Sequence, residues 1–250
     1  MDWTQAFYQQ QYELLARGDV WPNVWKKMSP SNPPPRVQLI ERLTGAGPKR
    51  ILELGCGSGI VAGATAAAGH TVVAVDLAPI AAANARQIAE SLPKGQMEVM
   101  EGDFFEFEPP GPFDVVSYFD GFGIGSDDDQ QRLLRRIAGW LSPSGCALID
   151  IYNPYHFARI DGIEYEETDQ VQGRTDFDPE ACRLLNSIWP SGNKNEMITQ
   201  SLRCYSPADL RVLLEGTGLR LDIMEPHESG PDARRLQFKE APTYLAKLVS

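Results

Sequence analysis

Residues 51–59 constrain the fold of this chain more than any other segment. The run 51–54 (Ile-Leu-Glu-Leu) has the length of a short strand, and Gly55, Gly57 and Gly59 follow it. Glycine lets a backbone turn sharply and touch a ligand, and the Ala-rich residues 60–68 predict a helix directly after the turn. A strand that passes through such a turn into a helix begins a parallel α/β sheet, and the N-terminus of that helix favours a negatively charged ligand group.

The alternation of strand and helix continues along the chain. Apolar and β-branched runs predict further strands at 71–75, 97–100, 113–118 and 146–152, and helical patterns lie at 79–90 and 130–141. Segments in this order favour an α/β fold with a doubly wound, mostly parallel sheet that is covered by helices on both faces. Asp76 ends the second strand, so its carboxylate is expected at the edge where such sheets bind ligands.

The segments on either side of this core do not show its alternation of strand and helix. Residues 1–45 predict a helical cap, with helices at 3–16 and 36–43 and an aromatic connector at 20–25. The polar stretch 156–205 has short apolar alternations and turn residues, which predict an antiparallel insertion over the carboxyl edge of the sheet. Residues 206–250 predict a helix capped by Ser206 and closing strands at 219–224 and 243–248. We therefore expect a single domain over residues 1–250, with its core at 46–155.

The composition of the chain disfavours polyanionic partners. Lys and Arg total 23 against 34 Asp and Glu, the net charge is −11, and no basic stripe offsets it, so we expect neither nucleic acid nor a membrane as partner. The uncharged run 54–75 is interrupted by glycines and is not read as a membrane span. The four cysteines and three histidines lack the spacing of a disulfide framework or zinc site, so we expect free thiols, no metal and a cytoplasmic location.

The glycine pattern alone fits two classes of enzyme. Residues 57–62 match G-x-G-x-x-A, which is typical of dinucleotide sites, so an NAD(P)-dependent oxidoreductase is one alternative. Two features argue against it. Glu53 is an acidic residue inside the first strand, where it would anchor the loop or an amino group of the ligand. Asp103 and Phe104 follow the third strand, where they would meet the edge and the face of an adenine.

Together these motifs resemble those of the class I S-adenosylmethionine (AdoMet)-dependent methyltransferases. Residues 53–59 are similar to motif I, Asp76 stands at the ribose-binding position and Asp103 at the adenine-binding position. Residues 113–120 resemble the fourth-strand motif, whose end faces the methyl group. Residues 141–145 resemble the turn before the fifth strand, with Ser144 in place of a glycine. The resemblance runs from about 50 to 152 and implies a Rossmann-like sheet of seven strands.

The resemblance also implies a set of contacts with AdoMet, whose product is S-adenosylhomocysteine (AdoHcy). Glu53 would hold the amino end, Asp76 the ribose diol and Asp103 the adenine amine. The other implied cofactor contacts come from the glycine turn and from the ends of the second, third and fourth strands: Gly55, Cys56, Gly57, Gly59, Leu77, Phe104 and Phe119.

Candidate residues for the acceptor side follow the fourth and fifth strands. Tyr118, Asp120 and His156 are candidate catalytic residues, His156 because its unperturbed pKa suits a base. The alternative for His156 is a loop histidine bonded to the backbone. The candidate substrate-contacting residues are the aromatic ones of the cap and of the fifth-strand loop: Tyr8, Tyr12, Trp25, Tyr152 and Tyr155. For the cap residues the alternative is the buried face of a helix.

We therefore expect methyl transfer from AdoMet to a nitrogen or oxygen of a small molecule in biosynthesis, mainly by proximity and orientation. The Asn/Asp-Pro-Pro-Tyr/Phe signature of base and glutamine N-methyltransferases is absent, since residues 118–121 read Tyr-Phe-Asp-Gly. A non-catalytic AdoMet-binding module is a further alternative. The cap, the connector and the insertion are expected to close over the ligand, because the ends of the strands would otherwise leave the sulfonium exposed.

Overall fold

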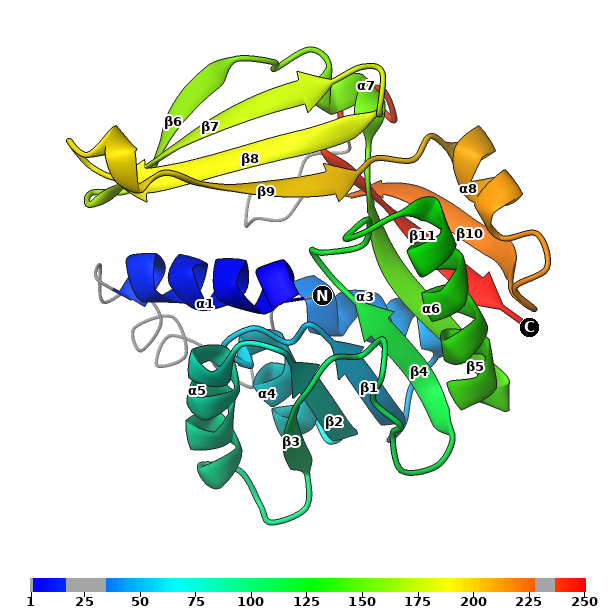
Figure 1. Cartoon of the computed structure of the whole chain (residues 1–250). Coiled ribbons are helices and arrows are strands. Elements are labelled where there is room, and N and C mark those ends of the chain that lie inside the picture. The colour runs from blue at the N-terminus through cyan, green and yellow to red at the C-terminus, as the bar shows by residue number, and fades with distance from the viewer. Residues whose placement is uncertain (1, 17–34, 228–236) are drawn as a thin grey trace.

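The computed structural model describes residues 2–16, 35–227 and 237–250, which form a large sheet, a smaller sheet and helices around and between them (Figure 1). The large sheet has seven strands in the order β10-β11-β5-β4-β1-β2-β3. Its strands are β1 (Arg50–Leu54), β2 (Thr71–Asp76), β3 (Met97–Glu101), β4 (Phe113–Tyr118), β5 (Leu141–Tyr152), β10 (Arg220–His227) and β11 (Thr243–Val249). Strands from β3 to β5 pair in parallel, whereas β11 is antiparallel to both of its neighbours. The predicted seven-stranded, mostly parallel sheet is confirmed.

The strand order places the ligand-binding edge of this sheet. The chain runs from β1 outward to β2 and β3, then returns to β4 on the other side of β1 and continues to β5. At such a reversal the loops that follow neighbouring strands diverge, which opens a crevice at the carboxyl ends of the strands. Gly55 follows β1 at this crevice, Asp76 ends β2, and Asp120 lies just beyond β4.

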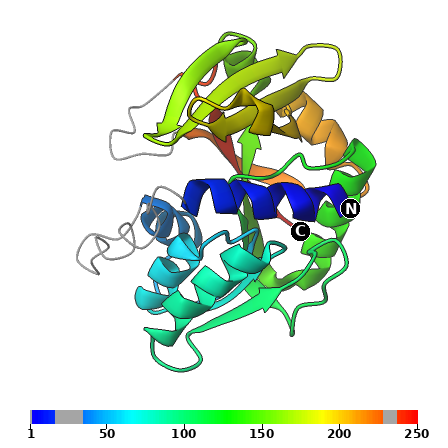
Figure 2. The same cartoon turned by 60° about the vertical axis from the view of Figure 1, so that its left-hand side comes forward.

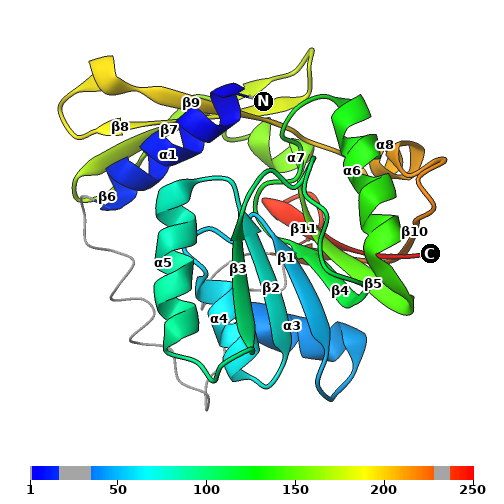
Figure 3. The same ribbon diagram turned by 60° about the horizontal axis from the view of Figure 1, so that its bottom comes forward.

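Helices cover both faces of the large sheet and bury its apolar side chains (Figure 3). Their bounds are α3 (Pro35–Thr44), α4 (Ile60–Ala67) and α5 (Pro79–Glu90) on one face, and α6 (Asp127–Trp140) and α8 (Pro207–Leu213) on the other. Successive residues of β1 point to opposite faces, so Leu54 packs with Leu133 of α6 while Ile51 packs with Ile40 of α3. All four side chains are fully buried.

Two predicted boundaries shift for local reasons. α6 begins at Asp127 and not at residue 130, because Ser126 and Asp129 form a capping box. The Ser126 hydroxyl oxygen accepts from the Asp129 N–H at 3.2 Å, and the Asp129 carboxylate accepts from the Ser126 N–H at 2.9 Å. β5 begins at Leu141 and not at residue 146, since Leu141 already pairs with Phe113 of β4.

The smaller sheet is the predicted antiparallel insertion. Its strands are β6 (Ile163–Thr168), β7 (Val171–Asp178), β8 (Arg183–Pro190) and β9 (Ile198–Arg203), with a 3-10 turn at Lys194–Glu196. They pair in chain order, each antiparallel to the next. The sheet follows the short helix α7 (Pro154–Phe157) and lies over the carboxyl edge of the large sheet (Figure 1, Figure 2).

Helix α1 (Asp2–Ala16) lies between the two sheets and contacts both sides (Figure 2). The Gln9 side-chain oxygen accepts a hydrogen bond from the Ile80 N–H of α5 at 3.4 Å. On the other side, the Tyr8 hydroxyl accepts from the Gln200 amide of β9, and Leu14 is buried against the smaller sheet. The predicted cap helix is confirmed, whereas the aromatic connector at 20–25 lies outside the described residues. Within the described ranges, no helix is long and apolar enough to cross a membrane.

Gly123, in the loop between β4 and α6, meets β9 backbone to backbone. The Arg203 N–H donates to the Gly123 carbonyl at 2.9 Å, and Gly123 has a φ of +114°. A Cβ at Gly123 would lie 2.3 Å from the Arg203 carbonyl oxygen, closer than two such atoms can approach. This contact joins the smaller sheet to the loop that carries Asp120.

We expect Gly123→Ala to destabilise the fold by roughly 1–3 kcal/mol, because the new methyl group meets backbone atoms and the positive φ is strained for alanine. Gly139→Ala is the matched control: Gly139 is exposed in α6, and nothing lies within 4 Å of the added Cβ. That change is expected to stabilise by about 0.5–1 kcal/mol. Urea unfolding of both variants measures the difference, and equal midpoints would contradict the close approach at Gly123.

Candidate active site

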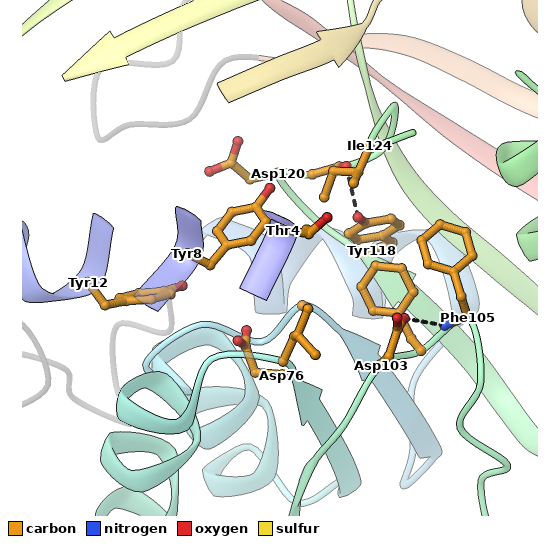
Figure 4. Close-up of a pocket in the computed structure, with 13 residues that line it drawn as sticks. Thr4, Tyr8, Tyr12, Asp76, Asp103, Phe105, Tyr118, Asp120 and Ile124 are labelled. Atoms are coloured by element: carbon orange, nitrogen blue, oxygen red, sulfur yellow. Dashed lines mark hydrogen bonds between the residues drawn. The ribbon is translucent and has the colours of Figure 1, made fainter. Parts of the chain in front are cut away.

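A cleft lies at the carboxyl ends of β1, β2 and β4, beneath α1 (Figure 4). This switch-point cleft has a volume of about 70 Å³. It is lined by Thr4, Tyr8, Tyr12, Gly55, Asp76, Leu77, Asp103, Phe104, Phe105, Tyr118, Asp120, Gly121 and Ile124. It therefore brings together five of the predicted cofactor residues and four of the predicted acceptor-side residues. The sequence did not single out Thr4, Phe105, Gly121 and Ile124, which carry no motif of their own.

The glycine turn is left-handed at each of its three glycines. Gly55, Gly57 and Gly59 have φ values of 61°, 56° and 79°, a region that disfavours residues with a side chain. A Cβ at Gly59 would lie 2.6 Å from the Ala85 Cβ, so glycine also allows α5 to approach the start of α4. At Gly57 the Cβ would lie 2.6 Å from the Tyr12 hydroxyl oxygen. The turn is thus packed closely on both sides.

Asp76 joins the glycine turn to the start of α5. Its carboxylate accepts from the Gly57 N–H at 2.7 Å and from the Ala78 N–H at 2.9 Å. Burial raises the pKa of Asp76, while these backbone donors lower it. Figure 4 shows the carboxylate directed into the cleft toward Tyr12. A carboxylate in this place can accept hydrogen bonds from ligand hydroxyls that reach the end of β2.

The far end of the cleft is aromatic. Phe104 packs on the Tyr118 ring, with the ring centroids 5.2 Å apart. The Asp103 carboxylate accepts from the Phe105 N–H at 2.8 Å, which holds it at the cleft wall. The Tyr118 hydroxyl donates to the Gly121 carbonyl at 2.8 Å, so the ring itself forms the wall. This end is suited to a flat heterocycle that presents an amine to a carboxylate.

A buried charged cluster lies on the α3 face of the sheet, outside the switch-point cleft. Arg36 of α3 forms an ion pair with Asp150 of β5, and its guanidinium lies 4.5 Å from the centre of the Phe119 ring. Burial raises the pKa of Glu53 to about 8, although the Arg36 guanidinium lowers it, and burial raises the pKa of Asp150 to about 6. The cluster has two buried carboxylates for one guanidinium. The Glu53 Oε2 atom is buried and has no hydrogen-bond partner among the described residues.

Asp120 is exposed toward the space under α1 and has an unusual backbone. Its φ of +60° is uncommon for a residue with a side chain, and its carboxylate accepts a hydrogen bond from the Tyr152 hydroxyl. Strained residues of this kind cluster at functional sites. The conformation directs the carboxylate away from β4 and toward the smaller sheet.

A second cavity, of about 350 Å³, lies between α1, Asp120 and the inner face of the smaller sheet. This inner cavity is lined by Gln11, Leu15, Asp120, Tyr152, Phe157, Tyr165, Glu167, Thr175, Leu184, Asn186, Ile188, Gln200 and Leu202. Among the described residues, Asp120 is the one that lines both spaces. Nine of these residues belong to the 156–205 insertion, and the sequence did not separate its inner face from its outer face.

Several predicted site residues lie away from both spaces. His156 binds the Glu240 carbonyl through Nδ1 at 2.8 Å, which favours the alternative interpretation of a histidine bonded to the backbone. Tyr155 is 53% exposed and lines neither space. Cys56 and Phe119 are buried in the core on the α3 face. Trp25 lies outside the described residues. Among the residues that are described, no group of three or more His, Cys, Asp or Glu could hold a metal ion.

Comparison with known proteins shows what the core of the chain is similar to. Residues 51–145 match the model of a methyltransferase domain. Over 120 residues the chain is 35% identical to the cypemycin N-terminal methyltransferase of Streptomyces sp, with 46% of each chain covered. Over 150 residues it is 30% identical to the ubiquinone biosynthesis O-methyltransferase of Pseudomonas aeruginosa, covering 58% of this chain and 63% of that protein. The chain thus spans about half to three fifths of the length of these relatives.

A solved structure extends the similarity to most of the fold. The CcbJ methyltransferase from Streptomyces caelestis matches with a TM-score of 0.70 at 22% identity, covering 88% of this chain and 98% of that one. Residues 51–145 match a methyltransferase domain, and the chain has the fold of the class I AdoMet-dependent methyltransferases. The predicted resemblance and the predicted fold are therefore confirmed. The comparisons give no support to the alternative of an NAD(P)-dependent oxidoreductase.

The buried Glu53 carboxyl group makes the stability of the fold depend on pH. The folded state holds the Glu53 proton up to about pH 8, whereas the ordinary pKa of the group is 4.5. Stability is therefore lost as the pH rises from 4.5 to 8. We expect Glu53→Gln to be more stable than the parent chain at pH 9 by a few kcal/mol, since one pKa unit is worth about 1.4 kcal/mol.

The difference between Glu53→Gln and the parent chain should shrink toward zero at pH 4.5. Denaturant unfolding between pH 5 and pH 9 measures it. Glu98→Gln, which removes an exposed carboxylate of β3, is the matched control and should show no such trend. A Glu53→Gln chain that is less stable at pH 9 would show that Arg36 holds the carboxylate ionised.

Proposed function

We propose that the chain transfers a methyl group from AdoMet to a nitrogen or oxygen of a small-molecule acceptor. The observation that carries this proposal is the meeting of two spaces at Asp120: the switch-point cleft at the glycine turn and the inner cavity under the smaller sheet. A group-transfer enzyme needs two ligands side by side, with the reacting atoms in contact. The inner cavity is within the range of about 300–1,000 Å³ that is usual for small ligands.

The residues of the cleft and of the buried charged cluster beside it fit AdoMet. Among the described residues, this cluster has one carboxylate more than it has cations, and Glu53 Oε2 has no hydrogen-bond partner. An ammonium group is the missing complement, and the methionine end of AdoMet carries one. The backbone of Gly55, Cys56, Gly57 and Gly59 can approach that same end closely once the Tyr12 side chain has moved away from Gly57.

The other cofactor roles follow from position. Asp76 would bind the ribose diol, Leu77 would pack on the adenine, and Asp103 would accept from its amine, with Phe104 along the ring. When bound, AdoMet supplies an electrophilic methyl group on a sulfonium. Phe119 lies under Arg36, so we assign it to the support of the charged cluster.

Helix α1 is proposed to act as a lid. The Tyr12 hydroxyl lies so close to Gly57 that Tyr12 and a ligand on the glycine turn cannot share this space, so binding requires the Tyr12 side chain to move. Tyr8 is linked to Gln200 of the smaller sheet, so α1 and the acceptor side are coupled. This arrangement excludes water from the junction of the two spaces when the lid is closed.

We propose that the residues on the acceptor side mainly position the acceptor and contribute less to its chemical activation. Asp120, held by Tyr152, would orient the acceptor atom and accept a proton from it. Tyr118 would form the wall behind that atom, because its hydroxyl is already engaged by Gly121. A small-molecule acceptor, no nucleic-acid partner, no metal and a cytoplasmic location complete the proposal, on the acidic composition and the scattered cysteines and histidines.

One experiment tests the class of reaction. Titration with AdoMet, AdoHcy and NAD by calorimetry should show binding of the first two and none of NAD. Incubation with methyl-labelled AdoMet and small acceptors should then give labelled product. Binding of AdoMet without product from any acceptor would favour a non-catalytic AdoMet-binding module. Tighter binding of NAD would overturn the assignment of AdoMet as the cofactor.

We expect Asp76→Asn to weaken AdoHcy binding by about 1.5–3 kcal/mol, the range for a hydrogen bond to a charged group. Because Asp76 also holds Gly57 and Ala78, a matched ligand separates the two roles. The parent chain should discriminate AdoHcy from its 2′-deoxy analogue, and the variant should bind both alike. If the variant still distinguished AdoHcy from its 2′-deoxy analogue, Asp76 would not be the residue that binds the ribose.

Deletion of residues 1–16 is expected to preserve AdoHcy binding but to lower turnover at least tenfold, since α1 closes the junction of the two spaces. Amide exchange in β8 and β9, which α1 contacts, should become faster in the truncated chain. Tyr8→Phe serves as the milder variant, because it removes the link to Gln200 and keeps the helix. Undiminished turnover after truncation would limit α1 to packing.

A further inference from the structure

The inner face of the smaller sheet carries a row of polar side chains. Asn186 of β8 pairs with Gln200 of β9, and Tyr165 of β6 reaches across β7 to them. Tyr165 can do so because residue 173 of β7 is glycine: a Cβ there would lie 2.3 Å from the tyrosine ring. The Tyr165 hydroxyl then donates to the Asn186 side-chain oxygen at 2.6 Å. The side chains of this row thus come from β6, β8 and β9, and they line the same cavity as Asp120.

This row keeps hydrogen-bonding groups for a ligand. Asn186 accepts from Tyr165 through its oxygen, and Gln200 donates to Tyr8 through its nitrogen. Within the described part of the chain, no bond engages the Asn186 amide nitrogen or the Gln200 carbonyl oxygen. One donor and one acceptor therefore stand side by side on the cavity wall. Such a pair suits the hydroxyl groups of a polar molecule, each of which can both donate and accept.

The charge of the inner cavity is negative. Asp120 and Glu167 both line it, and among the described residues that line it there is no lysine, arginine or histidine. Burial raises the pKa of Glu167, and the carboxylate of Asp120, which lines the same cavity, raises it further. A cation between them would relieve this repulsion, whereas a neutral ligand would leave it in place.

We propose that the acceptor is a small hydroxylated amine, whose nitrogen lies at Asp120 and whose hydroxyl groups bind the Asn186–Gln200 pair. This inference rests on the methyl transfer proposed above and narrows it to nitrogen. The ammonium gives one proton to the Asp120 carboxylate, and the exposed Asp120 passes it to water. The nitrogen–carbon bond then forms as the carbon–sulfur bond breaks, and the electron pair of that bond goes to sulfur. The methylated ammonium and the neutral thioether balance the charge.

The test uses binding, so it does not depend on turnover. Small amines are each paired with the alcohol of the same skeleton, such as glucosamine with glucose and tyramine with 4-(2-hydroxyethyl)phenol. Saturation-transfer NMR and calorimetry measure both members of each pair against the whole chain in the presence of AdoHcy. We expect the best hydroxylated amine to bind at least tenfold more tightly than its alcohol. In a separate incubation with methyl-labelled AdoMet in place of AdoHcy, the label should appear on the nitrogen of that amine.

Variants separate the cavity from nonspecific attraction. Glu167→Gln and Asn186→Ala are expected to lower the affinity of that amine at least fivefold, with AdoHcy affinity unchanged. Glu166→Gln removes an exposed carboxylate from the neighbouring position of β6 and is the matched control, with no effect expected. Glu167 lies at the rim, so its variant is expected to fold, which circular dichroism checks.

The outcomes distinguish this inference from the proposed function. Equal or tighter binding of the alcohols, with AdoHcy bound and methyl transferred to oxygen, would overturn the amine and leave methyl transfer in place. Amine binding that Glu166→Gln weakens as much as Glu167→Gln would overturn the assignment of the cavity, and so would a panel in which no amine binds. Failure of AdoHcy to bind at all would overturn the proposed function itself.

Discussion

The turn from β1 into α4 has no room for side chains, and much of the site depends on this. Three glycines with left-handed backbone conformations bring the chain from the sheet to the helix. Because they have no side chains, neighbouring elements can pack directly against their backbone. α5 can lie against Gly59, and Asp76 can bind the Gly57 N–H. A single methyl group in this turn would push away α5 or Tyr12. The close packing that shapes the cleft therefore depends on the absence of side chains at these three positions.

Most of the large sheet could be predicted from the sequence, because its strands and helices alternate and each strand ends at a recognisable residue. The positions of Asp76 and Asp103 at the cleft followed from the same pattern. Arg36 was beyond reach. Two acidic residues in buried strands, Glu53 and Asp150, indicate that a cation must lie nearby, but nothing along the chain says which of the 23 basic residues folds onto them.

The inner cavity was harder to predict for a different reason. In the insertion, Tyr165, Asn186 and Gln200 come from three strands, and their meeting depends on register, which short polar strands specify weakly. Gly173 is the sign in the sequence that a side chain crosses there, yet a lone glycine in a strand has several explanations. His156 shows the converse, since its favourable intrinsic pKa said nothing about the direction of its ring, which is bound to the Glu240 carbonyl.

The smaller sheet leaves the large one after α7 and returns just before α8, so both of its chain connections lie at one end of the molecule. The segment between these two connections contains none of the strands that flank the glycine turn. Under the proposed function, a different 163–203 segment could change the choice of acceptor while the cofactor side of the large sheet stays intact. The backbone junction of Gly123 with Arg203 limits such exchange, because any replacement must present a main chain that fits against residue 123.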